Sequence, residues 1–351
     1  MSGNLRNRRF VFRNEQCSEA DYREKMAQIQ MNSYTMLLSL IEEFEKVKRS
    51  SIHRFAKILK SNDCTGNSIS NSHNVKDSFY IASDGEHVKY CYRGHHITDA
   101  YDSSFVIEAE MVYENLNIGY GATRSKFCTN ITYSIHDVSY SDACYTSSDL
   151  FGCAGLRDKK YCILNKQYSK EDYEALVPKI IEHMKSTGEY GEFFPTALSP
   201  FAYNETLAQE YYPLSKDEVL ARGYRWKESD AKKYAITKGS NDLPNDIKDV
   251  PDTIIKEVIM CAHKDKDCNE MCATAFRIIP AELELYRKMG LPLPRLCPNC
   301  RHFARLQKTV PLKLWKRSCM KPGCINEFET SYAPDKPEIV YCESCYQQEV
   351  S

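Results

Sequence analysis

The chain has 351 residues, and its 47 lysines and arginines almost balance its 48 aspartates and glutamates. This length predicts two or three domains, and 42% hydrophobic residues exclude a chain that is disordered throughout. The absence of about 18 consecutive apolar residues excludes a membrane-spanning helix. Because the first residues lack the apolar core of a secretory signal, we expect a cytoplasmic protein without membrane partners. In that compartment the sixteen cysteines are expected to be reduced.

Residues 1–60 predict a short strand followed by a long amphipathic helix. Ser18 is suited to cap the helix, and no glycine or proline interrupts the chain from there to residue 60. Apolar side chains recur at helical spacing, and we expect them to dock on a neighbour, with a helix break near Ser50: they are Met31, Tyr34, Leu37, Leu38, Ile41, Phe44 and Val47.

Residues 61–166 have the pattern of a β-solenoid-like repeat. An aromatic residue or a cysteine returns about every 11–12 residues between polar turn residues, which is typical of short strands stacked in successive coils. We expect the solenoid cysteines to be core residues, because cysteine is small and apolar in practice. A twisted antiparallel sheet is the structural alternative. The predicted interior consists of Phe79, Tyr90, Phe127, Tyr140, Leu150 and Tyr161.

An internal repeat links the first two regions. Residues 5–22 align without gaps with residues 156–173, and both copies predict a basic strand, an asparagine turn and a serine-capped helix. Because solenoids need capping units at their ends, we expect the two copies to close the two ends of this one.

Residues 167–255 predict a helical and aromatic connecting region. A helix begins after Ser169, an extended aromatic stretch covers residues 193–203, and a second short helix ends at Gly223. All fourteen prolines of the chain lie between Pro178 and Pro337, and the polar stretch 228–252 is the expected boundary to the next domain.

Nine of the sixteen cysteines lie in the last 91 residues, which predicts tandem zinc ribbons over residues 256–351. Two close cysteine pairs, each supplied by a turn, can converge four thiolates on one tetrahedral ion. Four thiolates leave no open position for a substrate, so we expect two structural Zn²⁺ ions rather than catalytic ones. Cys261 and His263 are alternatives to the first of the eight predicted ligands, which are Cys268, Cys272, Cys297, Cys300, Cys319, Cys324, Cys342 and Cys345.

The residues around the first of these sites resemble a known family. The segments 272–278, 284–286 and 294–301 are similar to the "probable zinc-ribbon domain" family, although the first cysteine pair has one extra residue and no glycine follows Cys272. The segments 165–173 and 332–345 resemble uncharacterised zinc-binding proteins of candidate-phylum bacteria. These resemblances imply zinc binding in a bacterial cytoplasm and no activity.

A basic segment between residues 277 and 321 gives the functional hypothesis. It contains eleven lysines and arginines against two glutamates, with Phe303 and Trp315 among them, which is typical of a surface that contacts the phosphates of RNA or DNA. The expected contact residues are Arg295, Arg301, Arg305, Lys308, Lys313, Lys316 and Arg317.

The sequence thus predicts an α+β multi-domain protein: a solenoid-like repeat region flanked by helical segments, with two C-terminal zinc ribbons. The favoured function is non-enzymatic binding of nucleic acid or ribonucleoprotein. A protein-interaction scaffold is the alternative. A carbohydrate-active enzyme on the solenoid is less favoured, because no spacing singles out a pair of carboxylates and no catalytic residue can be named.

Overall fold

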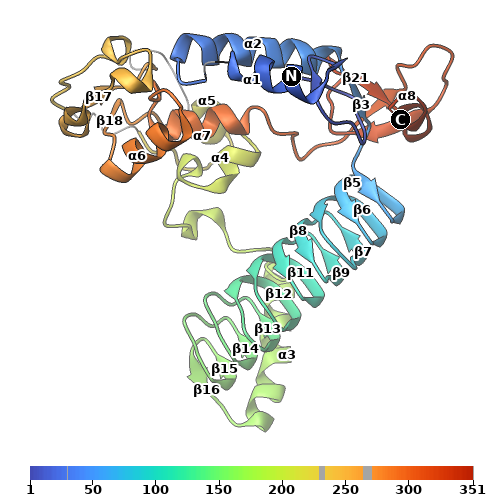
Figure 1. Cartoon of the computed structure of the whole chain (residues 1–351). Coiled ribbons are helices and arrows are strands. Elements are labelled where there is room, and N and C mark those ends of the chain that lie inside the picture. The colour runs from blue at the N-terminus through green and yellow to red at the C-terminus, as the bar shows by residue number, and fades with distance from the viewer. Residues whose placement is uncertain (30, 229–233, 264–270, 351) are drawn as a thin grey trace.

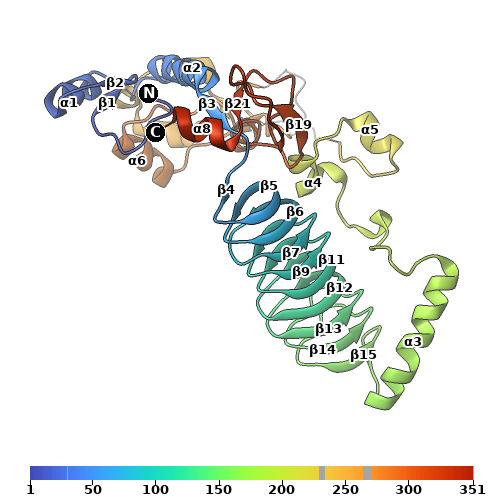
Figure 2. The ribbon, with the colours of Figure 1, turned by 90° about the vertical axis from the view of Figure 1, so that its right-hand side faces the viewer.

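The computed structural model describes residues 1–29, 31–228, 234–263 and 271–350. A β-solenoid of about nine turns spans residues 58–163. It extends as a rod from a head that contains the N-terminal helices and two cysteine-rich parts (Figures 1 and 2). The first cysteine-rich part surrounds Cys261, Cys272, Cys297 and Cys300, and the second surrounds Cys319, Cys324, Cys342 and Cys345. None of the described helices is both long and apolar enough to cross a membrane.

The solenoid strands pair in parallel, as the repeat predicted, and not as an antiparallel sheet. Successive coils are offset by 11 to 13 residues, so that Ile58 pairs with Ile69, Val88 with Ala100 and Ser125 with Val138. The strands are β4 (Ile58–Leu59), β5 (Asn62–Ser70), β6 (His73–Ile81), β7 (Glu86–Lys89), β8 (Tyr92–His95), β9 (Thr98–Tyr101), β10 (Ser104–Ile107), β11 (Glu110–Ile118), β12 (Ala122–Ile131), β13 (Ile135–Ser139), β14 (Ser148–Phe151) and β15 (Lys160–Ile163).

Most coils have four sides of three residues, because a residue with positive φ recurs at every third position over long runs of the solenoid. One such run comprises Asp84, His87, Tyr90 and Arg93, with φ between 52° and 57°. Asparagine and aspartate tolerate this left-handed conformation best among residues with a side chain, which explains why the region is rich in them. One residue per side points inward, as Val88, Cys91, Gly94 and Ile97 do in one coil.

The interior is lined by aliphatic side chains and cysteines and not by aromatic rings, so the predicted interior was wrong except for Leu150. Leu150 is fully buried in the solenoid core together with the cysteines Cys91, Cys128, Cys144, Cys153 and Cys162. A side of three residues is too short to enclose an aromatic ring. Phe127 and Tyr140 are buried on the outer surface instead, against the helix α3 (Lys170–Thr187). Tyr90 is 52% exposed, and neither Phe79 nor Tyr161 belongs to the core cluster.

The two copies of the internal repeat have the predicted local structure, but only one caps the solenoid. In the second copy β15 stacks in parallel on β14 and turns back into β16 (Lys166–Gln167) before α3 begins. In the first copy β1 (Val11–Phe12) and β2 (Glu15–Gln16) form a separate hairpin before α1 (Glu19–Ala27). This hairpin lies in the head and not at the solenoid end (Figure 2). The predicted capping of both ends was therefore wrong for the first copy.

The helix α2 (Tyr34–Ser50) runs across the head between the two cysteine-rich parts (Figure 1). It is separate from α1, so residues 1–60 form two helices rather than one long helix. The break near Ser50 is confirmed, with Ser51 as the C-cap. At its start, the Tyr34 N–H donates to the Asn245 carbonyl at 2.8 Å. None of its residues is fully buried, so the apolar stripe docks only in part.

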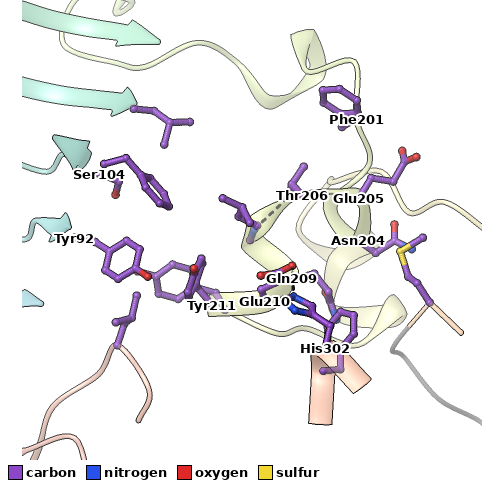
Figure 3. Close-up of a pocket in the computed structure, with 18 of the residues that line it drawn as sticks. Tyr92, Ser104, Phe201, Asn204, Glu205, Thr206, Gln209, Glu210, Tyr211 and His302 are labelled. Atoms are coloured by element: carbon purple, nitrogen blue, oxygen red, sulfur yellow. Dashed lines mark hydrogen bonds and ion pairs between the residues drawn. The ribbon is translucent and has the colours of Figure 1, made fainter. Parts of the chain in front are cut away.

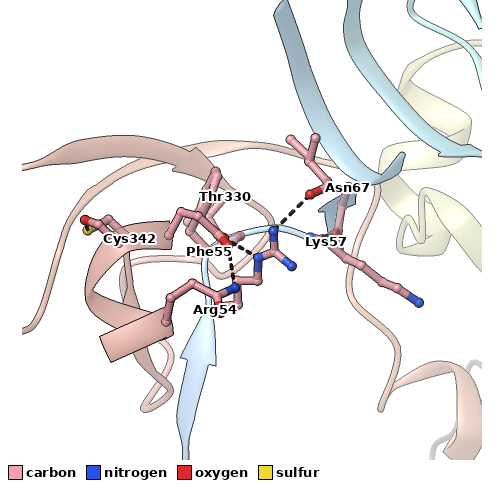
Figure 4. A network of polar contacts seen from close by, with 10 residues as sticks. Arg54, Phe55, Lys57, Asn67, Thr330 and Cys342 are labelled. Atoms are coloured by element: carbon pink, nitrogen blue, oxygen red, sulfur yellow. Dashed lines mark hydrogen bonds and ion pairs between the residues drawn. The ribbon is translucent and has the colours of Figure 1, made fainter. Parts of the chain in front are cut away.

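The end of α2 leads into the second cysteine-rich part. There β3 (Ile52–Arg54) pairs in parallel with β21 (Ile339–Tyr341). Thr330 Oγ1 donates to the Phe55 carbonyl at 2.6 Å, and the Lys57 N–H donates to Asn67 Oδ1 at 2.8 Å (Figure 4). These bonds fix the C-terminal part to the first coil of the solenoid.

The remaining elements are short. The connecting region contains the 3₁₀ turns Thr196–Leu198 and Tyr203–Glu205, which are followed by α4 (Leu207–Tyr211) and α5 (Lys216–Ala221). Three further 3₁₀ turns follow, at Ser240–Asp242, Ile247–Asp249 and Asp252–Lys256. The cysteine-rich parts contain β17 (Ile259–Met260), β18 (Ala275–Phe276), α6 (Pro280–Met289), α7 (Pro298–Leu306), β19 (Trp315–Ser318), β20 (Glu327–Thr330) and α8 (Glu343–Glu349).

Candidate metal centres

The first cysteine cluster consists of Cys261, Cys272, Cys297 and Cys300, whose sulfurs all lie within 4.8 Å of one another. The β17–β18 hairpin and the start of α7 position them. Cys297 is the N-cap of α7, and Pro298 starts the helix with the fixed φ that suits its first turn. One turn later, Cys300 lies beside Cys297, which is why the spacing of two intervening residues recurs in such sites.

The separations between sulfurs match those around a tetrahedral ion. Four thiolates at the usual Zn–S distance of about 2.3 Å lie about 3.8 Å from one another. Cys261 Sγ lies 3.8 Å from Cys300 Sγ, and Cys272 Sγ lies 3.9 Å from Cys297 Sγ. The Cys297 N–H also donates to Cys261 Sγ at 3.2 Å, which holds the two halves of the cluster together. This cluster could hold one metal ion.

The second cluster consists of Cys319, Cys324, Cys342 and Cys345 and has the same spread of at most 4.8 Å. Cys324 Sγ and Cys342 Sγ are 3.9 Å apart. The β19–β20 hairpin carries the first pair at its turn, and α8 begins directly after Cys342. The Cys342 N–H donates to Cys319 Sγ at 3.3 Å. This cluster too could hold one metal ion.

The thiols of the second cluster differ in acidity. Burial opposes ionisation of Cys342, but hydrogen bonds from Asn326 and Ser344 outweigh it and lower the pKa to about 6. Burial and the neighbouring thiols raise the pKa of Cys345 to about 12. One thiolate therefore forms readily and hinders the next from forming. A bound divalent cation removes this conflict, because it stabilises all four thiolates together.

The structure brings together seven of the eight predicted metal ligands. Cys268 lies outside the described residues. Cys261, one of the two alternatives to Cys268, is 1% exposed and occupies the remaining place in the first cluster. Sequence spacing gave Cys261 less weight because ten residues separate it from Cys272, whereas the other pairs are closer.

Three of the seven predicted nucleic-acid contacts are engaged within the protein. Arg295 is 8% exposed, lies 4.6 Å from the ring centre of Tyr34, and donates to the carbonyls of Leu243 and Pro244. Arg301 donates to Tyr286 Oη at 3.0 Å. These contacts hold the guanidinium groups against the protein, so Arg295 in particular cannot reach a phosphate in this conformation.

The third internally engaged residue is Arg317, which donates to the Ala333 and Glu338 carbonyls at 3.3 Å. It ties β19 to the segment that leads into β21. These contacts within the second cysteine-rich part explain the presence of Arg317 without a nucleic-acid ligand.

The other four predicted contacts, Arg305, Lys308, Lys313 and Lys316, are exposed. They lie on the stretch from the end of α7 to the start of β19, which joins the two cysteine-rich parts. Lys313 Nζ lies 5.3 Å from the ring centre of Trp315. Their positive charge is partly neutralised by nearby glutamates. Lys308 Nζ lies 3.5 Å from Glu45 Oε1, and Lys316 lies opposite Glu329 in the β19–β20 hairpin.

A pocket that the sequence did not predict lies between the solenoid, the connecting region and the first cysteine-rich part (Figure 3). Its volume is about 870 Å³. It is lined by Tyr92 from the solenoid, Tyr211 from the connecting region and His302 from the first cysteine-rich part. His302 Nε2 lies 2.9 Å from Glu210 Oε1. Gln209 is 4% exposed, and its Oε1 has no hydrogen-bond partner among the described residues. These residues come from distant parts of the chain, so no local motif could have indicated the pocket.

Comparison of the chain with protein-family models, with curated proteins and with solved structures finds no match. No family is therefore assigned to the chain. The structure itself shows a β-solenoid and two four-cysteine clusters, each of which could hold a metal ion.

Proposed function

We propose that the protein is a non-enzymatic, zinc-stabilised protein that binds nucleic acid or ribonucleoprotein through the stretch between its two cysteine clusters. The observation that carries the proposal is the exposed, cationic stretch from Arg305 to Lys316, held at each end by a set of four cysteines. Residues 301–326 contain no aspartate or glutamate.

Zinc is the ion that best suits both clusters. Four sulfur donors at tetrahedral separations favour Zn²⁺ over the hard cations Mg²⁺ and Ca²⁺, which take oxygen ligands. Four protein ligands also fill the coordination shell, so the proposed role is structural. Each cysteine-rich part is small, and metal binding supplies the folding free energy that its core does not.

Metal analysis of fresh, reduced protein tests the zinc proposal. We expect two zinc ions per chain. Cys345→Ser should reduce this to one, whereas Cys144→Ser should leave two, because Cys144 is a solenoid core residue. A wild-type content of zero or one ion would contradict the two-site proposal.

The proposed contact surface consists of Arg305, Lys308, Lys313 and Lys316. Each phosphate contact releases condensed counterions, so affinity must fall with salt, with a log–log slope of about −0.7 per contact for a single strand. Four contacts therefore predict a slope of about −3. Trp315 beside Lys313 offers a ring on which an unpaired base can stack.

A salt titration of the full chain with labelled single-stranded RNA and duplex DNA tests this surface. Replacing Arg305, Lys308 and Lys313 together by alanine should reduce the slope by about 2 units, since three contacts are lost, and leave the zinc content unchanged. The matched control replaces Lys170, Lys179 and Lys185 of α3, which are also exposed but lie on the solenoid. No binding at low salt would contradict the proposal.

A protein-interaction scaffold is the second candidate, and the pocket in Figure 3 favours it. Phe201 lines this pocket and is 59% exposed. A scaffold predicts a protein partner whose binding is lost in Phe201→Asp and is unaffected by the triple alanine change. Nucleic-acid binding predicts the opposite response of the two variants.

A further inference from the structure

The two copies of the internal repeat fold alike in detail. Positive φ occurs at Asn4, Asn7, Phe10, Arg13 and Asn14, and at the five positions 151 residues later, Gly155, Asp158, Tyr161, Leu164 and Asn165. The Cys17 N–H donates to the Phe10 carbonyl at 2.9 Å, and the Tyr168 N–H donates to the Tyr161 carbonyl at 2.9 Å. Residues 5–22, the N-terminal cap unit, thus repeat the backbone of residues 156–173, the C-terminal cap unit.

The C-terminal cap unit shows what such a unit binds. Its strand β15 pairs in parallel with β14, so that Lys160 lies on Ser148 and Cys162 lies on Leu150. This stacking leaves Cys162 only 1% exposed. The unit is therefore the last coil of a solenoid, and its hairpin with β16 covers the outer edge of that coil.

The N-terminal cap unit has the same backbone, but within the described part of the chain no solenoid coil stacks on it. Among the described residues, β1 pairs only with β2, and no strand lies parallel to it. Val11, the counterpart of Cys162, is only half-buried, and Leu5, the counterpart of Leu156, is 43% exposed. Val11 and Leu5 thus lack the neighbouring coil that covers their counterparts, although Asn4, just before the unit, is hydrogen-bonded to the Ile52 backbone.

We propose that the N-terminal cap unit binds the C-terminal end of a β-solenoid in another polypeptide, one that has three-residue sides and lacks a cap of its own. The inference does not depend on the zinc or nucleic-acid proposals. An end of this kind offers unpaired N–H and C=O groups and an open core, both of which the unit matches in backbone and side-chain spacing.

Charge defines the partner further. Residues 1–14 contain four arginines and no acidic residue. In the C-terminal cap unit, the basic Arg157 lies 5.5 Å from the ring centre of Tyr145, and the Lys159 N–H donates to Ser147 Oγ. The corresponding Arg8 is exposed, whereas Arg6 lies 5.8 Å from the ring centre of Tyr346. The partner coil is therefore expected to present an aromatic, hydroxyl or acidic side chain opposite Arg8, whereas Arg6 and Arg13 are already engaged within the chain by Tyr346 and Glu43.

A second copy of this chain is disfavoured as the partner. The end of its solenoid is already occupied by its own C-terminal cap unit, which is covalently attached and so present at high effective concentration. An incoming N-terminal unit would have to displace it.

A chimera of the full chain tests whether the open face fits a solenoid end. Residues 156–173 are replaced, without gaps, by the sequence of residues 5–22. We expect thermal unfolding of the solenoid within a few degrees of the wild type. The control chimera carries aspartate at the positions taken from Leu5 and Val11 and should lose the last coils. If both chimeras unfold equally early, the proposal is overturned.

A binding measurement tests the surface in its native place. The probe is a full chain in which a glycine–serine linker replaces residues 156–173, so that its solenoid ends uncapped. Immobilised wild-type chain should bind this probe at least tenfold more tightly than a Leu5→Asp, Val11→Asp chain does. Equal binding overturns the proposal. Concentration-dependent association of the wild type alone, lost in the double variant, would instead identify a second copy as the partner.

Discussion

The side chain of Asn115 joins two coils inside the solenoid, and its loss should destabilise the protein strongly. Asn115 is 3% exposed. Its Oδ1 accepts from the Cys128 N–H at 2.8 Å, and its Nδ2 donates to the Ser125 carbonyl at 2.9 Å. Asn115→Ala removes both bonds and leaves a buried N–H unpaired. One lost hydrogen bond and one unpaired buried donor together predict a decrease of about 2–4 kcal/mol in the free energy of unfolding.

Equilibrium urea unfolding at saturating zinc, followed by far-ultraviolet circular dichroism, measures this change. The matched control is Glu110→Ala, an exposed position at the start of the same strand, for which we expect a change within about 0.5 kcal/mol. Hydrogen exchange at the amides of β11 and β12 locates the effect. If the two variants unfold at the same urea concentration, the hydrogen bonds of the Asn115 side chain do not stabilise the solenoid.

Three further predictions concern other parts of the fold. Tyr140 stacks on Phe127 with ring centres 4.6 Å apart and accepts from the Gly191 N–H. Tyr140→Ala should therefore lower the free energy of unfolding by about 3–5 kcal/mol and expose α3 to hydrogen exchange. Tyr140→Phe should lower it by about 1 kcal/mol, because only the hydrogen bond is lost. Burial raises the pKa of Cys91 and of Cys128 from 9.0 to about 12. The neutral thiols therefore stabilise the fold fully below pH 9, and this contribution is lost as the pH rises from 9 to 12. In urea titrations, Cys91→Ala should make the free energy of unfolding decline less steeply over this pH range. An unchanged decline would show that the buried Cys91 thiol does not cause it. Chelation of the metal should abolish exchange protection in residues 256–351 and preserve it in the solenoid, and equal loss in both would show that the solenoid depends on the metal.

The solenoid could be predicted because its repeat period is visible in the sequence, but the residues that line its interior were predicted wrongly. The prediction followed the aromatic residues, which are the largest apolar side chains and therefore the most visible signal. The true signal is a triplet pattern of non-aromatic residues, such as Val88, Cys91, Gly94 and Ile97, with one inward position per side. Aromatic residues such as Tyr140 are buried from outside by a helix that the local repeat does not include.

The cysteine clusters were predictable in part, because close pairs on turns fix two ligands each. Cys261 was harder to assign, since it reaches the cluster through the β17–β18 pairing rather than through a short turn. The place of the N-terminal cap unit could not be derived either. Sequence similarity predicts the same local backbone, but what a unit stacks on depends on the coils available to it.

The pairing of β3 with β21 closes the chain into a ring, with consequences for the order of folding. Arg54 and Glu343, which form an ion pair, are 289 residues apart. During synthesis the solenoid can form coil by coil through neighbours 11 to 13 residues away, while β3 stays an unpaired edge until β21 has been synthesised. A C-terminal fragment that begins at residue 256 lacks this strand and therefore exposes β21. The four ligands of the second cysteine cluster and β21 are thus synthesised late, and only then can β21 pair with β3.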